Sequence, residues 1–240
     1  MSASYDGTDD EGKKTLGFHL ISIFVGLLLI IPAWATSLHI QRQLQSENLF
    51  SHLTQSWGTV CFLAGVLICL ASLLLPTFRR LLLPAYVFGH EVSHALFVFL
   101  FYGKVSAFKA STEGGYIIAN RNNIWIALAP YIFPFWTVVF ALLYIVLGIV
   151  INVTPLVPLF FFLYGASWMF NLFWTLWMIP LGQSDLSLNG TFLSITIIYL
   201  INALGFSLLL EMSLKSTTIL DWCFGSINAL LDVFDLLLSL

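Results

Sequence analysis

Long apolar runs separated by short polar connections make up most of this chain. A helix of about 20 apolar residues is long enough to cross the hydrocarbon core of a bilayer. Runs of about that length cover residues 16–38, 57–76, 81–102, 124–150, 155–179 and 191–210. The pattern therefore predicts an all-α polytopic membrane protein with about six transmembrane helices.

Polar residues and prolines mark where these helices are expected to end or bend. Residues 41–55 form a polar connection after the first run, and residues 77–80 form a short hinge before the third. Pro130 and Pro134 are expected to kink the fourth run, because proline cannot donate the backbone hydrogen bond of a helix interior. Residues 180–190 break the helical pattern between the fifth and sixth runs.

The segment between the third and fourth runs has the pattern of a small β-hairpin. Residues 105–111 roughly alternate in polarity, residues 113–115 read Glu-Gly-Gly, and residues 116–119 favour a strand. An edge of this hairpin could pair with an extended peptide, as in recognition by strand addition. The alternative is that it is an ordinary connection outside the membrane.

The C-terminal segment differs from the six runs because it carries carboxylates among its apolar residues. Asp221, Asp232 and Asp235 lie among Leu, Ile and Phe in residues 217–240. Burying three carboxylates in lipid is costly, so a seventh span is disfavoured. We expect an amphipathic tail that lies on the membrane surface.

Basic residues give an orientation for the first spans. The first run is too long for the apolar region of a signal peptide, so we expect it to be retained. Lys13 and Lys14 precede it, and Arg79 and Arg80 lie between the second and third runs, which is the same side if each run crosses once. The positive-inside rule makes that side cytoplasmic, so the third run begins near the cytoplasmic face.

Composition excludes a water-soluble domain and several kinds of site. Only 9% of the residues are charged and 59% are hydrophobic, whereas soluble domains have about 25% charged residues. The net charge is −3 and no basic patch is present, so we expect no nucleic-acid partner. The three cysteines form no Cys-x-x-Cys pair, which argues against a disulfide framework and a cysteine zinc site.

The third run contains His90-Glu91-Val92-Ser93-His94 close to its start. Residues four apart share one face of a helix, so the two imidazoles can bind the same Zn²⁺. Glu91 can then act as the general base that accepts a proton from water. Three ionisable groups within an apolar run are costly in lipid unless they bind something or face a polar interior. The alternatives are a chance match and a purely structural polar cluster.

A catalytic zinc site usually has three protein ligands, and Asp185 is the favoured third. It lies where a long apolar run breaks near Pro180 and Gly182, and broken helices at membrane depth usually line cavities or are buried in protein. The alternative is that Asp185 caps the next helix in an ordinary loop.

These residues give the chain a resemblance to the site-2 protease family of intramembrane zinc metalloproteases, over residues 81–210. The matching segments are Gly89–His94, residues 113–117, Ala129-Pro130-Tyr131, Phe170-Asn171-Leu172, Pro180 and Ser184-Asp185. The resemblance implies a zinc ion held by His90, His94 and Asp185, with Glu91 as the base. It also implies hydrolysis of peptide bonds in a membrane-protein or peptide substrate within or beside the lipid bilayer.

The chain departs from the usual second motif of that family in two respects. Asp185 is followed by Leu186, where the family commonly has glycine, and Asn171 lies further from Asp185 than the pattern has it. Gln183 or Asn189 could therefore replace Asn171 as the donor that stabilises an oxyanion. Each of these three side chains is equally compatible with ordinary loop chemistry.

The order of the spans raises a topological question about the third ligand. If residues 124–150 and 155–179 both cross the membrane fully, Asp185 emerges on the face opposite His90. Ligands of one zinc ion cannot be separated by a bilayer of about 30 Å. Either residues 155–179 are re-entrant, or the break lies deep in the membrane, or Asp185 is not a ligand.

We divide the chain into a polar N-terminal tail (1–15), two N-terminal transmembrane helices (16–80), a metalloprotease-like membrane core (81–211) and the amphipathic C-terminal tail (212–240). The favoured function is an intramembrane zinc metalloprotease. The alternative is a non-proteolytic membrane protein that uses the His/Glu/Asp cluster for metal binding or transport. A scaffold with a degenerate site is disfavoured because Glu91 is present.

Overall fold

The computed structural model describes residues 4–5, 16–45, 57–214 and 219–239. The expectations for most of the polar tail 1–15 and for residues 46–55 lie outside these described residues.

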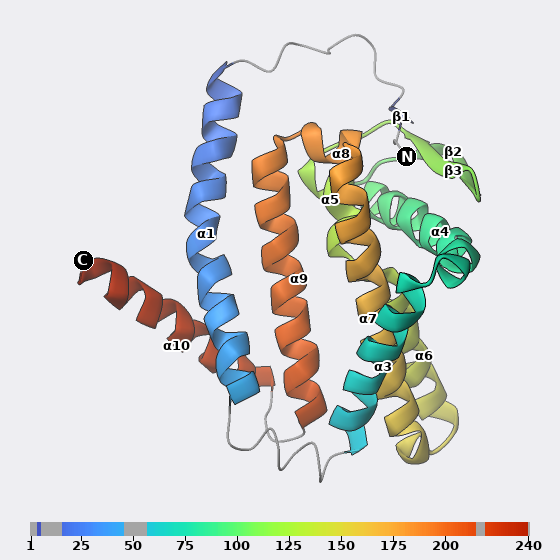
Figure 1. Cartoon of the computed structure of the whole chain (residues 1–240). Coiled ribbons are helices and arrows are strands. Elements are labelled where there is room, and N and C mark those ends of the chain that lie inside the picture. Colours follow the sequence, from blue (N-terminus) through green and yellow to red (C-terminus); the bar gives the residue numbers. More distant parts are fainter. Residues whose placement is uncertain (1–3, 6–15, 46–56, 215–218, 240) are drawn as a thin grey trace. The chain divides into compact units, whose positions relative to one another are not determined.

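Helices dominate the part of the chain that the structure describes (Figure 1). They are α1 (Leu16–Gln45), α3 (Trp57–Leu74), α4 (Pro76–Leu100), α5 (Ile124–Ile132), α6 (Phe135–Val150), α7 (Val157–Met178), α8 (Ser184–Ser187), α9 (Thr191–Leu214) and α10 (Ile219–Leu238), with 3-10 turns at Thr154–Leu156 and Ile179–Leu181. Five of the described helices are long and apolar enough to cross a membrane, and the number is six if the bent pair α5–α6 forms one span. The predicted all-α polytopic membrane fold is confirmed.

The chain forms two compact units, and helices α1, α3, α6, α7 and α9 each contribute residues to both. The first unit contains Met1–Leu27, Ala71–Trp136 and Phe170–Ile198. The second contains Leu28–Leu70, Thr137–Met169 and Tyr199–Leu240.

In the first unit, α4 begins earlier than the sequence pattern predicts. Leu75 has extended backbone angles and Pro76 follows in the first turn, where a missing N–H costs nothing. The hinge predicted at residues 77–80 is therefore wrong, because these residues are helical. Arginine is tolerated there since the guanidinium of Arg79 stacks over the Trp177 ring, 4.3 Å from its centroid.

The early start of α4 also moves the motif along the helix. His90 lies 14 positions after Pro76, which is about 21 Å at 1.5 Å per residue. The motif is thus past the middle of α4, nearer the hairpin than the N-terminal end, and its expected position close to the start of the helix is wrong. This placement removes the topological objection to Asp185, because His90, His94 and Asp185 no longer need to meet across a whole bilayer.

The fourth run is broken at the predicted place. Helices α5 and α6 meet at a bend of 71°. The break falls at Phe133, which is extended, and at Pro134, while Pro130 lies inside α5. By contrast α7 is one continuous helix of 22 residues. The bend of a broken or re-entrant span is therefore found in the fourth run, whereas residues 155–179, for which a re-entrant path was considered, contain the unbroken helix α7.

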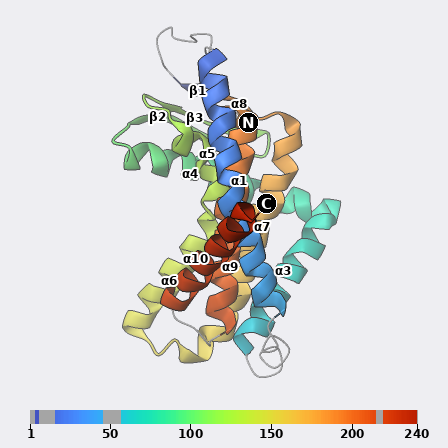
Figure 2. The ribbon, with the colours of Figure 1, turned by 90° about the vertical axis from the view of Figure 1, so that its left-hand side faces the viewer.

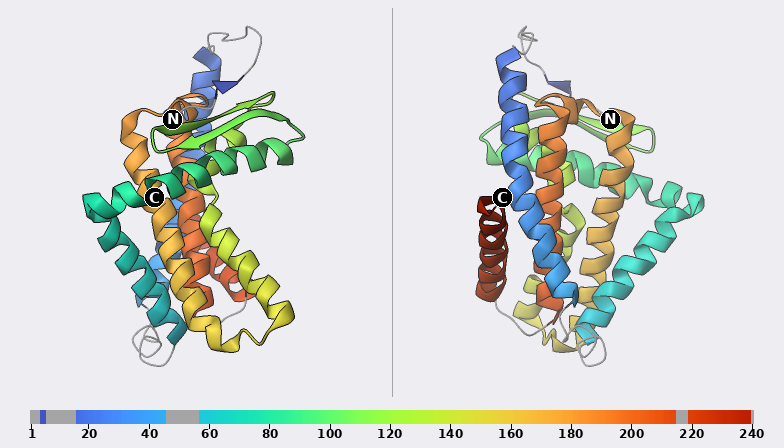
Figure 3. Two further views of the ribbon diagram at one scale, coloured as in Figure 1. Left: turned by 90° about the vertical axis from the view of Figure 1, so that its right-hand side faces the viewer. Right: turned by 60° about the vertical axis from the view of Figure 1, so that its left-hand side comes forward.

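The predicted hairpin is present and packs against α4 (Figure 3, left). Strands β2 (Val105–Ser111) and β3 (Gly114–Ala119) are antiparallel. A further strand, β1 (Ser4–Tyr5), which the sequence pattern did not indicate, lies parallel to β3, so the strand order is β1-β3-β2. A small core of fully buried apolar side chains joins the hairpin to α4 and α5: Val98, Ile117, Ala119 and Ile126.

In the second unit, the tail forms helix α10, which lies against α1 (Figure 2). A methyl group on Gly225 would lie 2.5 Å from the His39 ring, so glycine permits this approach. Ala229 and Val233 are buried. Arg42 of α1 forms an ion pair with Asp232 at 2.7 Å. The predicted amphipathic helix is present among the described residues, and its position on the membrane surface stays a prediction.

Candidate metal centre

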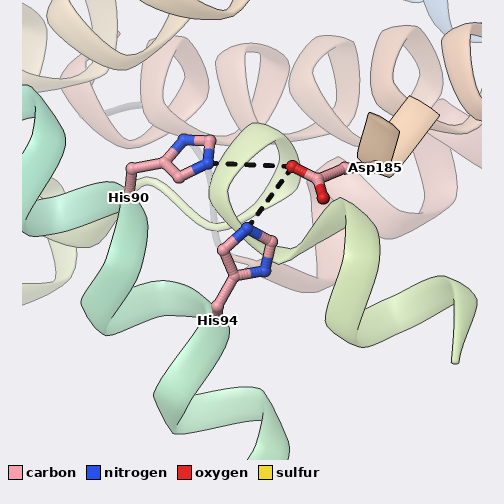
Figure 4. Close-up of side chains that lie close together, drawn as sticks. All are labelled: His90, His94 and Asp185. Carbon is pink, nitrogen blue, oxygen red and sulfur yellow. Dashed lines mark ion pairs between the residues drawn. The ribbon is translucent and has the colours of Figure 1, made fainter. Parts of the chain in front are cut away.

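Three side chains from two distant segments of the sequence converge in the first unit (Figure 4). His90 and His94 come from α4 and Asp185 comes from α8. The Asp185 Oδ2 lies 3.9 Å from Nε2 of His90 and 3.5 Å from Nε2 of His94. All three residues are buried, and a ligand atom from each lies within 4.8 Å of the others.

The His94 ring is oriented by the backbone of α5. Its Nδ1 lies 2.8 Å from the carbonyl oxygen of Ile126. Because that oxygen only accepts, Nδ1 carries the proton and Nε2 presents its lone pair to the site. Asn123 caps α5 by accepting a hydrogen bond from the Ile126 N–H at 2.9 Å, which fixes the first turn of this short helix.

The His90 ring is held by aromatic neighbours. Its Nδ1 lies 3.0 Å from the Tyr86 hydroxyl, one helical turn earlier in α4. Tyr86 stacks on Trp174 of α7, with ring centroids 4.7 Å apart and an angle of 12°. Tyr131 of α5 packs edge-on against His90, with centroids 5.4 Å apart. These contacts limit rotation of the imidazole, so its Nε2 points at Asp185.

Asp185 is presented by the irregular segment between α7 and α9. Gly182 and Gly190 have positive φ angles of 69° and 93°, which glycine adopts without a steric penalty. The Ser194 hydroxyl donates to the Leu186 carbonyl at 2.9 Å and so ties α8 to α9. The Tyr131 hydroxyl donates to Asp185 Oδ2 at 3.5 Å.

Asp185 is not a helix cap in this structure. The N-cap of α8 is Gln183, and Asp185 lies inside the first turn with its carboxylate toward the two histidines. The capping alternative considered from the sequence is therefore not what the described residues show.

Glu91 lies beside the three ligand candidates, under the hairpin. It is 1% exposed, and its Oε2 is buried without a hydrogen-bond partner among the described residues. A methyl group on Gly115 would lie 2.7 Å from Oε1 and 2.6 Å from Cγ of Glu91. Strand β3 can approach this carboxylate so closely only because residue 115 has no side chain.

The donor set fits a metal ion. Two ligand atoms each about 2.0–2.2 Å from a tetrahedral ion are about 3.3–3.6 Å apart, close to the distances of 3.5 and 3.9 Å that join Asp185 to the imidazoles. Apart from its ion-pair contact with Asp185, the buried His94 Nε2 has no hydrogen-bond partner among the described residues, as expected for a nitrogen that serves as a ligand. The three residues could therefore hold a metal ion.

The structure brings together the four site residues named from the sequence, namely His90, Glu91, His94 and Asp185. It does not bring the suggested oxyanion donors to them by hydrogen bonds. The amide nitrogens of Asn171 and Asn189 and the amide oxygen of Gln183 are buried without a partner among the described residues.

Sequence reasoning missed the residues that support the ligands. Tyr86 could have been found, because it precedes His90 by four residues and so shares its helical face. The carbonyl of Ile126 and the approach of Gly115 carry no sequence signal of their own, since both depend on how the hairpin and α5 fold back onto α4.

No protein-family model, no curated protein and no solved structure matches this chain.

Proposed function

We propose that this protein is an intramembrane zinc metalloprotease similar to the site-2 protease family. The observation that carries the proposal is the convergence of His90, His94 and Asp185 in one buried cluster with Glu91 beside it. Two imidazoles and one carboxylate are a typical protein ligand set of catalytic zinc, as distinct from the all-oxygen sets of calcium and magnesium.

Each side chain has a definite part in this proposal. Zinc would supply a Lewis acid that polarises the scissile carbonyl and acidifies water. His94, fixed by the Ile126 carbonyl, and His90, fixed by Tyr86, hold their Nε2 atoms toward the metal position. The Glu91 carboxylate accepts the proton of the attacking water and returns it to the leaving amine.

The hairpin suits a substrate in extended form. A transmembrane helix exposes no peptide bond, so the substrate segment must unwind before hydrolysis. Strand β3 passes directly over Glu91 at Gly115. Among the described residues β1 pairs with β3 only at Ile118 and Ala119, so the backbone of an unwound segment could align with β3 near Gly115 by strand addition. Membrane proteins or membrane-adjacent peptides are therefore the proposed substrates.

Metal analysis of the purified full-length protein tests the metal site. The wild type is expected to hold about one zinc per chain, because a structural or catalytic site binds a single ion. His90→Ala and Asp185→Ala should lose it, and Asp232→Ala, which removes an exposed carboxylate of the second unit, should keep it. A wild type without stoichiometric metal overturns the proposal, whereas full affinity in Asp185→Ala removes only the third ligand.

Cleavage is tested by comparing new protein N-termini in membranes that contain the wild type or Glu91→Gln. Cleavage products should depend on Glu91 and disappear with a zinc chelator, then return when zinc is added. A chain that binds zinc stoichiometrically but yields no Glu91-dependent product would instead be the non-proteolytic metal-binding or transport protein.

A further inference from the structure

One face of α7 carries three polar side chains whose donor atoms have no hydrogen-bond acceptor among the described residues. Asn171, Trp174 and Thr175 are spaced three and four residues apart, so they lie on the same side of the helix. The amide nitrogen of Asn171, the indole nitrogen of Trp174 and the hydroxyl of Thr175 are all buried without a hydrogen-bond partner among the described residues. Buried polar groups are nearly always hydrogen-bonded, so three together need an explanation.

The Thr175 hydroxyl departs from the behaviour of five other helix hydroxyls, and it shares its lack of a partner with the Ser226 hydroxyl of α10. Serine and threonine inside helices usually donate to the carbonyl four residues earlier. Thr36, Ser37, Ser93, Ser167 and Thr196 all do so here, at distances from 2.6 to 2.9 Å. Thr175 is 1% exposed and its hydroxyl lacks even this local bond.

The Trp174 indole departs in the same way from two other tryptophans. The Trp136 N–H donates to the Ala85 carbonyl at 3.2 Å, and the Trp222 N–H donates to the Ser207 hydroxyl at 3.0 Å. Trp174 is only 3% exposed, and its N–H has no such acceptor among the described residues.

This face of α7 borders the metal centre through one aromatic contact. The Trp174 ring stacks on Tyr86, and the Tyr86 hydroxyl is the hydrogen-bond partner of His90. All of these residues belong to the first unit.

We propose that Asn171, Trp174 and Thr175 form a buried binding site for water, which supplies the metal centre. Water fits for two reasons. The donor atoms are closed off from the surface, so only a very small ligand can reach them. Internal water also typically satisfies buried polar groups that are otherwise unpaired. A peptide carbonyl would also accept these hydrogen bonds, but it would need an open groove along α7.

The supply role rests on the proposed protease function. Each hydrolysis consumes one water: its oxygen bonds to the carbonyl carbon, the carbon–nitrogen bond breaks, and the amine nitrogen takes a proton. Water is scarce in the hydrocarbon core of a bilayer. A store beside Tyr86 and His90 therefore meets a need that a soluble hydrolase does not have.

Hydroxyl-radical labelling of the full-length protein tests the water site without requiring activity, because X-ray pulses create the radicals from bound water itself. Trp174 should be labelled in the wild type despite its burial. In Thr175→Val the labelling should fall by about threefold or more, because a donor that holds the water is lost. Thr175→Ser, which restores the hydroxyl, should restore the labelling.

Thr196→Val is the matched control, because the Thr196 hydroxyl is already bonded to the Phe192 carbonyl. It should leave the labelling of Trp174 unchanged. A wild-type Trp174 that is not labelled, or that is labelled equally in Thr175→Val, overturns the water site.

Measured cleavage rates distinguish the proposed water supply from the protease function on which it rests. Thr175→Val should cleave about tenfold more slowly with unchanged zinc content, since the loss of a group that supports a metal site from outside its ligands typically has an effect of this size. An unchanged rate in Thr175→Val overturns the supply role. If the wild type shows no cleavage at all while Trp174 labelling follows Thr175, the protease proposal and the supply role fail together and the water site stands.

Discussion

Buried polar side chains occur in both units of this protein, but they are used differently. In the second unit, the Ser207 hydroxyl donates to Gln43 and accepts from the Trp222 N–H, both at 3.0 Å, and the Gln43 amide also donates to Glu211. In the first unit, Nε2 of His94 and Oε2 of Glu91 have no hydrogen-bond partner among the described residues.

The difference separates a structural polar cluster from one that could hold a metal ion. Gln43, Ser207 and Trp222 satisfy each other and so link α1, α9 and α10. Two other buried atoms of this unit, Nε2 of His39 and Oγ of Ser226, have no hydrogen-bond partner among the described residues. The candidate metal centre instead has hydrogen-bond partners on Nδ1 of both histidines, while their Nε2 atoms face Asp185, which is the arrangement that metal sites require. Four substitutions test this contrast.

Glu91→Gln should have the largest effect. The amide cannot accept a proton from water, so cleavage should fall by about 10²–10⁴-fold while zinc content and the unfolding temperature stay close to wild type. Glu113→Gln, in the exposed hairpin turn, is the matched control and should cleave normally. Wild-type cleavage by Glu91→Gln would mean that another group is the base.

Gly115→Ala should disturb the Glu91 carboxylate from the side of strand β3. The new methyl group would lie within 2.8 Å of Glu91 and of the Lys109 carbonyl, so the hairpin must shift. Cleavage should fall by about tenfold to a hundredfold, because small displacements in an active site have effects of that size. Gly148→Ala adds a methyl group at an ordinary distance of 3.6 Å and should be neutral. Equal rates for the two variants would contradict the role of the close approach.

Ser207→Ala should weaken the second unit and leave the metal centre intact. It leaves Gln43 and the Trp222 N–H each without one hydrogen bond, so the free energy of unfolding in detergent should fall by about 1–2 kcal/mol. Zinc content should not change. Ser187→Ala, at an exposed hydroxyl that bonds within its own turn, should alter neither quantity. Loss of zinc in Ser207→Ala would show that the two polar clusters are not independent.

Arg42→Gln should have the smallest effect. The ion pair between Arg42 and Asp232 is about half exposed on both sides, and exposed pairs contribute less than about 1 kcal/mol. The unfolding temperature should change by no more than a few degrees, and cleavage should not change at all. A larger loss than in Ser207→Ala would reverse the ranking of the two contacts.

Much of this fold could be predicted from the sequence because membrane spans and breaks have strong local signals. Apolar runs gave the helices, and Pro134 marked the bend between α5 and α6. The start of α4 was misplaced because Arg79 and Arg80 suggested a hinge. The contact of Arg79 with the Trp177 ring, which makes a helical arginine favourable there, is tertiary and has no local signature.

The candidate site was predictable where its chemistry is local. His90, Glu91 and His94 follow from spacing on one helix, and Asp185 follows from a carboxylate at a helix break. The supporting groups were not predictable. Every residue has a backbone carbonyl, so nothing in the sequence singles out that of Ile126, and Gly115 resembles any turn glycine. Their roles come from the packing of the hairpin and α5 on α4.

The two glycines that flank α8 have a consequence for the evolution of this protein. A side chain at position 182 would meet empty space, so glycine is required there by the backbone conformation alone. Gly190 also has a positive φ angle. Any other residue at either position would strain the segment that delivers Asp185. Relatives that keep the same site should therefore retain a Gly-x-x-Asp-x-x-x-x-Gly signature together with His-Glu-x-x-His. Drift should be faster at the exposed apolar residues of α7 and α9, where any apolar side chain can be accommodated.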